Sequence, residues 1–297
     1  MLPGRQLARL GAPSNTEKSD ECDGDWHRQE EVKFSYLTVT KSAPGRFEIN
    51  WDNASGVGSV TAVTGAAGGP GPLIGSGRAA DVYALGAGQV LRRYRTAHSC
   101  AAEASLMTYL REAGYPVPEV FDAAGPDLVM QRLDGPDMLA DLASRPWQIA
   151  RHARTLAGLH DRLHQIPAPT GLPQPLGPGG QILHLDLHPG NVMLTRDGPV
   201  VIDWSNGVSG PAGADVAMAY LIMASSDMDG PPPWLSLPAC GLRRMFVRRF
   251  RQAVQDDPGP HLARAARHRM NDANVRPAEA VRLRRIIRQA GRSPGPR

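Results

Sequence analysis

The sequence predicts an α+β fold of two lobes, in which a small β-rich N-lobe precedes a larger, mainly α-helical C-lobe. Short β-like runs bounded by glycine and proline are frequent in residues 71–133. Apolar residues at helical spacing dominate residues 134–297. The chain has 297 residues, of which 41% are hydrophobic, so it can bury the core that two such lobes need.

Residues 1–70 are predicted to be a poorly structured extension that ends in a linker. All three lysines lie in it, whereas the later basic residues other than histidine are arginines. The runs VKFSYLTVT and RFEINW, on either side of SAPGR, form a possible hairpin. The Gly- and Ala-rich run GVGSVTAVTGAAGGPGP is typical of a flexible linker.

The N-lobe is predicted from four β-like runs and one helix. LIGSGRAADVYAL and QVLRRYR are joined by Gly-Ala-Gly and are typical of a hairpin. A helix is expected from about Ser99 to Ala113, because Leu106 and Leu110 stand one turn apart and Gly114 is placed to end it. VPEVFDA and DLVMQRL indicate two further strands.

The C-lobe is predicted from its helical periodicities. The segment 147–165 carries apolar residues at helical spacing, PVVIDW is typical of a strand, and a helix is expected from about Asp215 to Met223. Two arginine-rich runs, GLRRMFVRRFRQ and AVRLRRIIRQA, follow as amphipathic helices. Their expected apolar faces are Leu242, Met245, Phe246 and Phe250, then Leu283, Ile286, Ile287 and Ala290.

Charge and composition exclude several classes of protein. The formal net charge is +4, but the arginines after Gly241 lie opposite apolar faces without interleaved aromatic residues. This favours solvated helix faces over a nucleic-acid or membrane surface. No apolar run is long enough for a membrane span or a secretory signal, so we expect a cytoplasmic protein. Cys22, Cys100 and Cys240 are far apart, which predicts reduced thiols.

The stretch HLDLHPGNVML, residues 184–194, concentrates the residues that suggest chemistry. Asp186 and Asn191 flank a Pro-Gly turn, and Asp203 follows the apolar strand. Phosphoryl transfer needs a carboxylate near the attacking hydroxyl, an amide oxygen on magnesium, and a second carboxylate between metal and phosphates. The three residues have the order and spacing of the catalytic loop and metal-binding aspartate of protein-kinase-like folds.

HLDLHPGNVML followed by VVIDW resembles the aminoglycoside phosphotransferase and choline kinase-like family, over about residues 72 to 290. The resemblance implies a two-lobed protein-kinase-like fold that uses Mg²⁺ and ATP or GTP. It also implies that Asp186 is the catalytic base or hydroxyl-orienting group, while Asn191 and Asp203 hold the metal ion. The phosphate acceptor would be a hydroxyl group of a small molecule.

The same resemblance implies supporting roles for three neighbours of this motif. His184 would brace the loop from within, and His188 stands where it could contact the γ-phosphate. Asp215 would hold the catalytic loop. A simple N-cap of the following helix is an equally good interpretation of Asp215.

The N-lobe resembles the family more loosely. In GSGRAADV, Gly75 and Gly77 match the phosphate-binding loop, but Ala80 takes the third glycine position. Arg92 falls where the family carries its phosphate-binding lysine, with Glu103 on the next helix as its ion-pair partner. The backbone from Gln131 to Leu133 would face the purine, and backbone recognition does not distinguish ATP from GTP.

Two rival functions remain open on the sequence. A nucleotide-binding pseudo-kinase without turnover would explain the missing lysine and glycine. A metal-dependent hydrolase would use His184, Asp186 and His188 as a zinc or iron triad on one strand face. Pro189 ends any such strand, which disfavours the triad. His160 and His164 stand one turn apart on a core-like helix, where a packed or capping role is favoured over metal binding.

The acceptor is expected to be neutral or anionic. A polycationic aminoglycoside would need clustered carboxylates in the C-lobe. The acids after Gly241 are few: Asp256, Asp257, Asp272 and Glu279. The charge therefore favours a sugar, an amino alcohol or a macrolide-like metabolite, and leaves the oligomeric state open.

Overall fold

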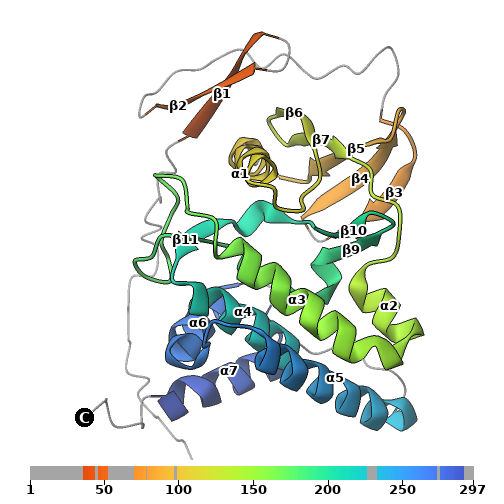
Figure 1. Cartoon of the computed structure of the whole chain (residues 1–297), viewed down its shortest axis with the longest axis vertical. Helices are drawn as coiled ribbons and strands as arrows, with labels where there is room; N and C mark the ends of the chain where they lie inside the picture. Colours follow the sequence, from red (N-terminus) through yellow and green to blue (C-terminus); the bar gives the residue numbers. More distant parts are fainter. Residues whose placement is uncertain are drawn as a thin grey trace, which may run out of the picture. The chain divides into compact units, whose positions relative to one another are not determined.

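The computed structural model describes residues 36–43, 46–52, 70–77, 79–96, 99–225, 233–272 and 275–290 (Figure 1). Most of the expected extension and linker lies outside these residues. Within the extension, strands β1 (Tyr36–Ala43) and β2 (Arg46–Asp52) pair antiparallel, which confirms the expected hairpin. The boundaries expected at residues 70/71 and 133/134 stay predictions.

The N-lobe is a five-stranded antiparallel sheet in the order β3-β4-β5-β7-β6. The run LIGSGRAADVYAL, expected as one element, contributes two strands. The Gly-Ala-Gly turn that follows contains Ala87 and Gly88 with φ of +59° and +71°, a left-handed pair suited to a tight hairpin. The strands are β3 (Leu73–Ser76), β4 (Ala80–Leu85), β5 (Gln89–Tyr94), β6 (Val120–Ala124) and β7 (Asp127–Gln131).

The expected N-lobe helix is present as α1 (Ala101–Glu112) and lies against β6 (Figure 1). Leu106 and Leu110 are buried, as their one-turn spacing predicts. Gly114 has φ of +77°, the left-handed conformation that ends a helix at little cost in glycine. The helix therefore begins two residues later than expected and stops where the sequence indicates.

The C-lobe is built mainly from helices, and Figure 1 shows α3 to α7 gathered together. The helix predicted over 147–165 appears as a short 3₁₀ turn followed by α3, which packs against α5. Helices α2 and α6 were not predicted from the sequence. The helices are α2 (Met138–Ser144), α3 (Ile149–Leu163), α4 (Ala212–Ser225), α5 (Pro233–Ala253), α6 (Leu262–Arg269) and α7 (Pro277–Ala290).

Four short strands of the C-lobe form two antiparallel pairs, β8 with β11 and β9 with β10. The strand expected over PVVIDW ends early, at Val201. Asp203 has φ of +66°, and Trp204 begins the 3₁₀ turn η3 (Trp204–Asn206), so neither continues the extended backbone. The strands are β8 (Gln181–Leu183), β9 (Val192–Thr195), β10 (Gly198–Val201) and β11 (Val208–Gly210).

The amphipathic helices at the end of the chain bury part of their expected apolar faces. On α5, Phe246 and Phe250 are buried, but Leu242 and Met245 are 38% and 43% exposed, so the expectation was wrong for these two. Val247, which was not part of the expected face, is buried with them, so the covered face of α5 is rotated from the expected one. On α7, Leu283 is buried, while Ile286 and Ile287 are half-buried.

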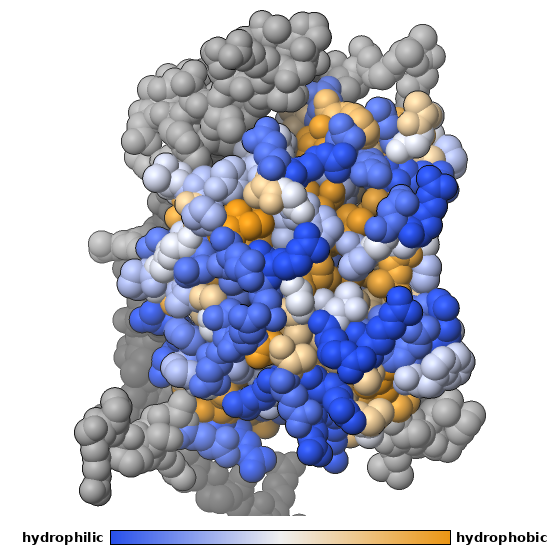
Figure 2. All heavy atoms as spheres, viewed as in Figure 1, coloured by the Kyte–Doolittle hydropathy of each residue, from blue (hydrophilic) through white to orange (hydrophobic). Residues whose placement is uncertain are grey.

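The exposed apolar side chains are scattered over many elements. In Figure 2 most of the described surface on the visible face is hydrophilic, with small separate apolar areas. Scattered exposure of this kind is normal for a folded domain. Among the described residues, no helix is both long and apolar enough to cross a membrane.

Replacing Phe250 with alanine is expected to lower the free energy of unfolding by about 3–5 kcal/mol, because the fully buried ring would leave a cavity. Met245→Ala on the same helix is the matched control and should change it by less than about 0.5 kcal/mol. Urea unfolding followed by circular dichroism measures both. Equal losses in the two variants would contradict this description of the α5 face.

Candidate active site

The β9–β10 hairpin brings the three expected catalytic residues together. Asn191 immediately precedes β9, and its carbonyl accepts a hydrogen bond of 3.0 Å from the amide of Ile202, next to Asp203. The Asn191 side-chain amide donates to the backbone oxygen of Asp186 at 2.8 Å and to its carboxylate at 3.1 Å. Asp186, Asn191 and Asp203 therefore gather at the open end of one hairpin.

The loop that carries Asp186 is held by a buried carboxylate. Leu185 has φ of +61°, which is strained for a branched side chain. Its amide donates to the Asp215 carboxylate at 2.7 Å, and Asp215 is 1% exposed. Helix α4 begins at Ala212, so Asp215 lies inside its first turn and is not the N-cap. The N-cap interpretation was wrong, whereas this geometry suits the loop-holding role.

His164 completes a buried ionic chain that the sequence did not reveal. Its two ring nitrogens face carboxylates, with Nε2 3.2 Å from Asp215 and Nδ1 2.8 Å from Asp256. Burial alone would lower the pKa of His164, but hydrogen bonds to the two carboxylates outweigh it and raise this pKa to about 9. The pKa of Asp215 falls to about 2, because the His164 interactions exceed the effect of burial. An imidazolium between two carboxylates thus keeps Asp215 ionised.

His160, one turn earlier on α3, has the packed role that the sequence favoured. Its ring is fully buried and lies 5.2 Å, centroid to centroid, from Phe250. Nδ1 donates to the Leu156 carbonyl at 3.0 Å, and among the described residues Nε2 has no hydrogen-bond partner. Burial is the main reason that its pKa is lowered to about 4, so the ring is neutral near pH 7.

His184 packs inside the loop, as the resemblance implies. Its ring lies 4.5 Å, centroid to centroid, from Trp204 and is fully buried. Nε2 donates to the Ile202 carbonyl at 3.0 Å, so Nδ1 is the acceptor for the Asp186 amide at 3.3 Å. One ring thereby connects the Asp186 loop to the backbone beside Asp203.

His188 lies beside Asp186, with Nε2 3.8 Å from the carboxylate. Its Nδ1 accepts a hydrogen bond of 3.1 Å from the Gly190 amide, and a Cβ at Gly190 would stand 2.8 Å from the ring. Burial is the main cause that lowers the pKa of His188, which favours a neutral imidazole over a lysine-like cation. A contact with the γ-phosphate stays a prediction.

The rival metal triad of His184, Asp186 and His188, already disfavoured by Pro189, is not supported. Within the described ranges, no group of three or more His, Cys, Asp or Glu side chains could hold a metal ion. His184 is turned to the Ile202 carbonyl and packs on Trp204 instead. The hydrolase alternative loses its metal centre.

Arg92 on β5 reaches from the N-lobe sheet to the candidate metal-binding aspartate. It forms the expected ion pair with Glu103 at 2.9 Å, and its other terminal nitrogen lies 2.6 Å from the Asp203 carboxylate. The Tyr94 hydroxyl donates to the second oxygen of Glu103, a partner that the sequence gave no sign of. The side chains of Arg92 and Glu103 are 11% and 4% exposed, so this ion pair is largely shielded from water.

The pKa of Glu103 is raised and the pKa of Asp203 is lowered, because burial and Arg92 act on both with different weight. For Glu103, burial raises the pKa more than Arg92 and Tyr94 lower it. For Asp203, burial acts in the same sense, but the charge and hydrogen bond of Arg92 outweigh it and hold its pKa below the ordinary value. Asp203 therefore stays ionised, as a metal ligand must.

The glycine-rich loop is described except for Arg78. A Cβ at Gly75 would lie 3.7 Å from Val82, an ordinary contact, and one at Gly77 would lie 3.3 Å from the Ala80 carbonyl. A residue with a Cβ would therefore fit at position 75, whereas at position 77 the contact would be tight. Arg95 fixes the flanks of the loop through Asp81 at 2.5 Å. Phosphate binding by these glycines stays a prediction.

Residues 131–133, which were expected to face the purine, are partly hydrogen-bonded within the N-lobe sheet. Gln131 ends β7, and its side chain accepts a hydrogen bond of 3.3 Å from the Glu119 amide. The Arg132 amide donates to the Gly88 carbonyl at 2.9 Å. Leu133, half-buried, follows immediately, and its contact with a purine stays a prediction.

The donor set fits a magnesium ion. Because the Asn191 amide nitrogen is turned to Asp186, its side-chain oxygen is the atom left for a cation. One Asp203 oxygen accepts from Arg92 and from the Ser205 hydroxyl at 3.0 Å, and the carboxylate has a second oxygen. Two hard oxygen ligands, completed by phosphates and water, are typical of Mg²⁺ in phosphoryl-transfer sites.

The fold and the family follow from comparisons with known proteins. A model of the phosphotransferase enzyme family matches residues 71–179 and 171–237, more than half of the chain. The structure is similar to a thermostable mutant of aminoglycoside phosphotransferase APH(4)-Ia in its apo form, at 14% identity and a TM-score of 0.51. That match covers 75% of this chain and 95% of the other. The two-lobed, protein-kinase-like fold is therefore confirmed, and the chain belongs to the phosphotransferase enzyme family.

Two further structures share the fold. An ethanolamine kinase of Plasmodium vivax matches at 11% identity and a TM-score of 0.50, covering 75% of this chain and 82% of that one. A variant of APH(4)-Ia in a ternary complex with ADP and hygromycin B matches at 15% identity and a TM-score of 0.51, with 75% and 94% covered. No curated protein matches the chain in sequence.

The raised pKa of His164 predicts a loss of stability at alkaline pH. The folded-state value of about 9 exceeds the ordinary 6.5, so the stabilisation is complete below pH 6.5 and disappears as the pH rises through 9. The free energy of unfolding should fall by on the order of 3 kcal/mol over this range, at 1.36 kcal/mol per pKa unit. Urea unfolding at several pH values measures it.

His164→Gln should remove most of this pH-dependent fall. His268→Gln is the control and should keep it, because burial lowers the pKa of His268, the opposite direction from His164. The same slope in wild type and His164→Gln would show that the chain of His164, Asp215 and Asp256 does not carry the charge assigned to it.

Proposed function

We propose that this phosphotransferase moves the γ-phosphoryl group of a nucleoside triphosphate, ATP or GTP, to a hydroxyl group of a small molecule. The observation that carries the proposal is the junction at the open end of the β9–β10 hairpin. There, the Asn191 amide donates to Asp186, and the backbone of Asn191 is bonded beside Asp203. The residues that the chemistry needs are thus neighbours.

Each residue has a defined task in this proposal. Asp186 orients the acceptor hydroxyl and takes its proton as the oxygen attacks phosphorus. Its direction is set by the Asn191 amide and by the strained loop that Asp215 holds. Asn191 and Asp203 would hold Mg²⁺, which when bound neutralises charge on the phosphates.

Arg92 would contact phosphate oxygens in place of a lysine. Its guanidinium is held by Glu103 and stays charged at any physiological pH. The fork geometry of arginine suits phosphate, so a substitution of lysine by arginine is compatible with nucleotide binding. Glu103 binds one terminal nitrogen of the guanidinium, and the other is available to Asp203 or to a phosphate.

The acceptor is proposed to be neutral or anionic. Of the four acids after Gly241, Asp256 is bound to His164, and Asp272 and Glu279 are both bound to Arg269. Carboxylates engaged in this way do not form a cluster for a polycation. An antibiotic-, sugar- or amino-alcohol-like molecule without several positive charges is the proposed class.

A pseudo-kinase without turnover is the second candidate, and one contact favours it. The Arg92 guanidinium lies 2.6 Å from Asp203, on an oxygen that a metal ion could use. Weak or absent metal binding would leave a protein that binds nucleotide but does not transfer phosphate. Against it, Asp186, Asn191 and Asp203 are all present and adjacent.

Asp186→Asn is expected to lower turnover by about 10²–10⁴-fold, because the amide cannot take the proton. Asp203→Ala should abolish it by removing a metal ligand. The measurement is release of nucleoside diphosphate from ATP or GTP with magnesium, with and without a panel of sugars, amino alcohols and antibiotics. Asp197→Asn, on the exposed turn of the same hairpin, is the control and should keep activity.

The outcomes of this assay separate the two candidates. Release that one panel member raises and both variants abolish supports the transferase and names its acceptor class. No release, with thermal stabilisation by magnesium and nucleotide, supports the pseudo-kinase. Neither release nor stabilisation contradicts both.

Arg92→Ala is expected to weaken nucleotide binding by about tenfold or more, the usual effect of losing a charged hydrogen bond. Arg92→Lys should retain most of the affinity. Arg93→Ala is the control, because alternate residues of a strand face opposite sides and Arg93 is bound to Asp127 instead. Calorimetric titration with a non-hydrolysable nucleotide measures all three. Unchanged affinity in Arg92→Ala would remove Arg92 from the nucleotide site.

A further inference from the structure

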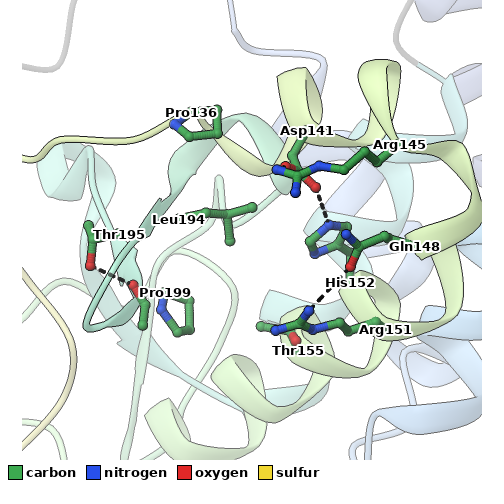
Figure 3. A pocket seen from close by; sticks show the side chains of 11 residues that line it. Pro136, Asp141, Arg145, Gln148, Arg151, His152, Thr155, Leu194, Thr195 and Pro199 are labelled. Atoms are coloured by element: carbon green, nitrogen blue, oxygen red, sulfur yellow. Dashed lines mark hydrogen bonds and ion pairs between the residues drawn. The ribbon is translucent and has the colours of Figure 1, made fainter.

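A pocket of about 230 Å³ lies in the C-lobe, beside the β9–β10 hairpin (Figure 3). One wall comes from α2 and the first turns of α3, and the other comes from the turn end of the β9–β10 hairpin with Pro136. None of the expected catalytic, nucleotide-binding or metal-binding residues lines it. The proposed phosphotransferase site therefore does not account for this pocket.

The helical wall carries more positive than negative charge. Asp141 is the acidic residue of the lining, and its buried carboxylate is bound by Arg145 and by His152 Nε2 at 2.7 Å. Arg145 lines the pocket, and its side chain remains 49% exposed. Arg151 is exposed and is hydrogen-bonded to the Gln148 side-chain oxygen at 3.3 Å. The one carboxylate is thus bound through both oxygens, whereas two guanidinium groups border the pocket.

His152 adds a nearly buried polar atom to this wall. Its side chain is 6% exposed, and Asp141 fixes the ring through Nε2. Within the described ranges, no hydrogen bond reaches Nδ1, and this nitrogen is not among the polar atoms enclosed without a partner. His152 lines the pocket, and the Asp141 carboxylate holds its ring in place. A buried ring fixed in this way is a built feature rather than a flexible surface side chain.

The opposite wall is apolar. Figure 3 shows Pro136, Leu194 and Pro199 facing the polar side chains of the helices. The volume corresponds to roughly eight water molecules at about 30 Å³ each, below the usual range of about 300–1,000 Å³ for drug-sized ligands. The occupant must be small, with an anionic group for the arginines and an apolar body for the other wall.

We propose that this pocket binds a small organic anion, separately from the nucleotide and from the phosphate acceptor. The anionic group lies between Arg145 and Arg151, and the apolar body packs on Leu194 and the two prolines. Charge-assisted hydrogen bonds from guanidinium groups favour carboxylate or phosphate oxygens over neutral acceptors. Because the helical wall offers more hydrogen-bond donors than acceptors, it favours a ligand with several acceptor oxygens.

The two sites are far enough apart for simultaneous occupation. Asn191 and Asp203 lie at the open end of the β9–β10 hairpin, whereas Thr195, Gly198 and Pro199 line the pocket at its turn end. A strand of four residues spans about 13 Å at 3.3 Å per residue. A bound anion therefore contacts the far end of the hairpin and leaves the Asp186 junction open.

The test uses benzoate as the probe, with benzyl alcohol as its neutral analogue and phenyl phosphate as the phosphate-bearing analogue. Binding to the full chain is measured by ligand-observed NMR, with and without saturating magnesium and ATP analogue. Arg151→Ala should weaken benzoate binding by about tenfold or more, because a charged hydrogen bond is lost. Arg154→Ala is the matched control, an exposed arginine on the same helix outside the pocket, and should not change it.

The site is supported if benzoate or phenyl phosphate binds in the presence of nucleotide and this binding is lost in Arg151→Ala but not in Arg154→Ala. The anion that binds more tightly identifies the preferred anionic group. If an anion binds, three results overturn the proposal. These are equal binding by benzyl alcohol and benzoate, displacement of both anions by the nucleotide, or equal affinity in Arg151→Ala and Arg154→Ala. No binding of either anion at 20 mM overturns it as well. Because each readout is binding and not turnover, failure of the proposed phosphotransferase activity would not affect the result.

Discussion

The hydrogen bond from the Leu185 amide to the buried carboxylate of Asp215 is the constraint on which the arrangement of the candidate site depends. It holds a branched residue at positive φ, and so directs the next residue, Asp186, toward Asn191. A buried carboxylate can do this only if its charge is balanced. His164 supplies the balance from α3, and Asp256 shares the same imidazolium from the segment after α5. Three distant parts of the C-lobe thus keep one loop in a strained conformation.

Arg92 makes a second long-range connection, between the N-lobe sheet and the hairpin that ends at Asp203. Its guanidinium is shared by a nearly buried glutamate and by an aspartate with a side chain 37% exposed. The two carboxylates respond in opposite ways, because burial dominates at Glu103 while the arginine dominates at Asp203. In this contact, Arg92 is placed either to bind the phosphates of a nucleotide or to occupy an oxygen that a metal ion would use. The chemistry of arginine allows both, since a fork can bind carboxylate and phosphate alike.

The β9–β10 hairpin links these features, because each of its ends borders a different site. At the open end, one backbone hydrogen bond from Ile202 to Asn191 keeps the candidate metal ligands adjacent. At the turn end, Leu194, Thr195 and Pro199 line the pocket beside α3. Each strand of the hairpin has four residues, and the β9 backbone is also bonded to Pro136 before α2. The candidate catalytic residues and the proposed anion site therefore share one hairpin.

The sequence by itself determined the two-lobed α+β architecture, most elements and the phosphotransferase class, because turn residues, hydrophobic periodicity and the spacing of Asp186, Asn191 and Asp203 are all local patterns. It also placed Arg92 opposite Glu103 through the resemblance to a family. Other features arise from groups far apart in the chain, and only the tertiary structure decided them. Asp215 is not a cap but a buried anchor, and its partner His164 lies 51 positions away in the sequence. Leu242 and Met245 have helical spacing yet face solvent, because burial depends on which neighbour covers a helix face and not on its pattern alone.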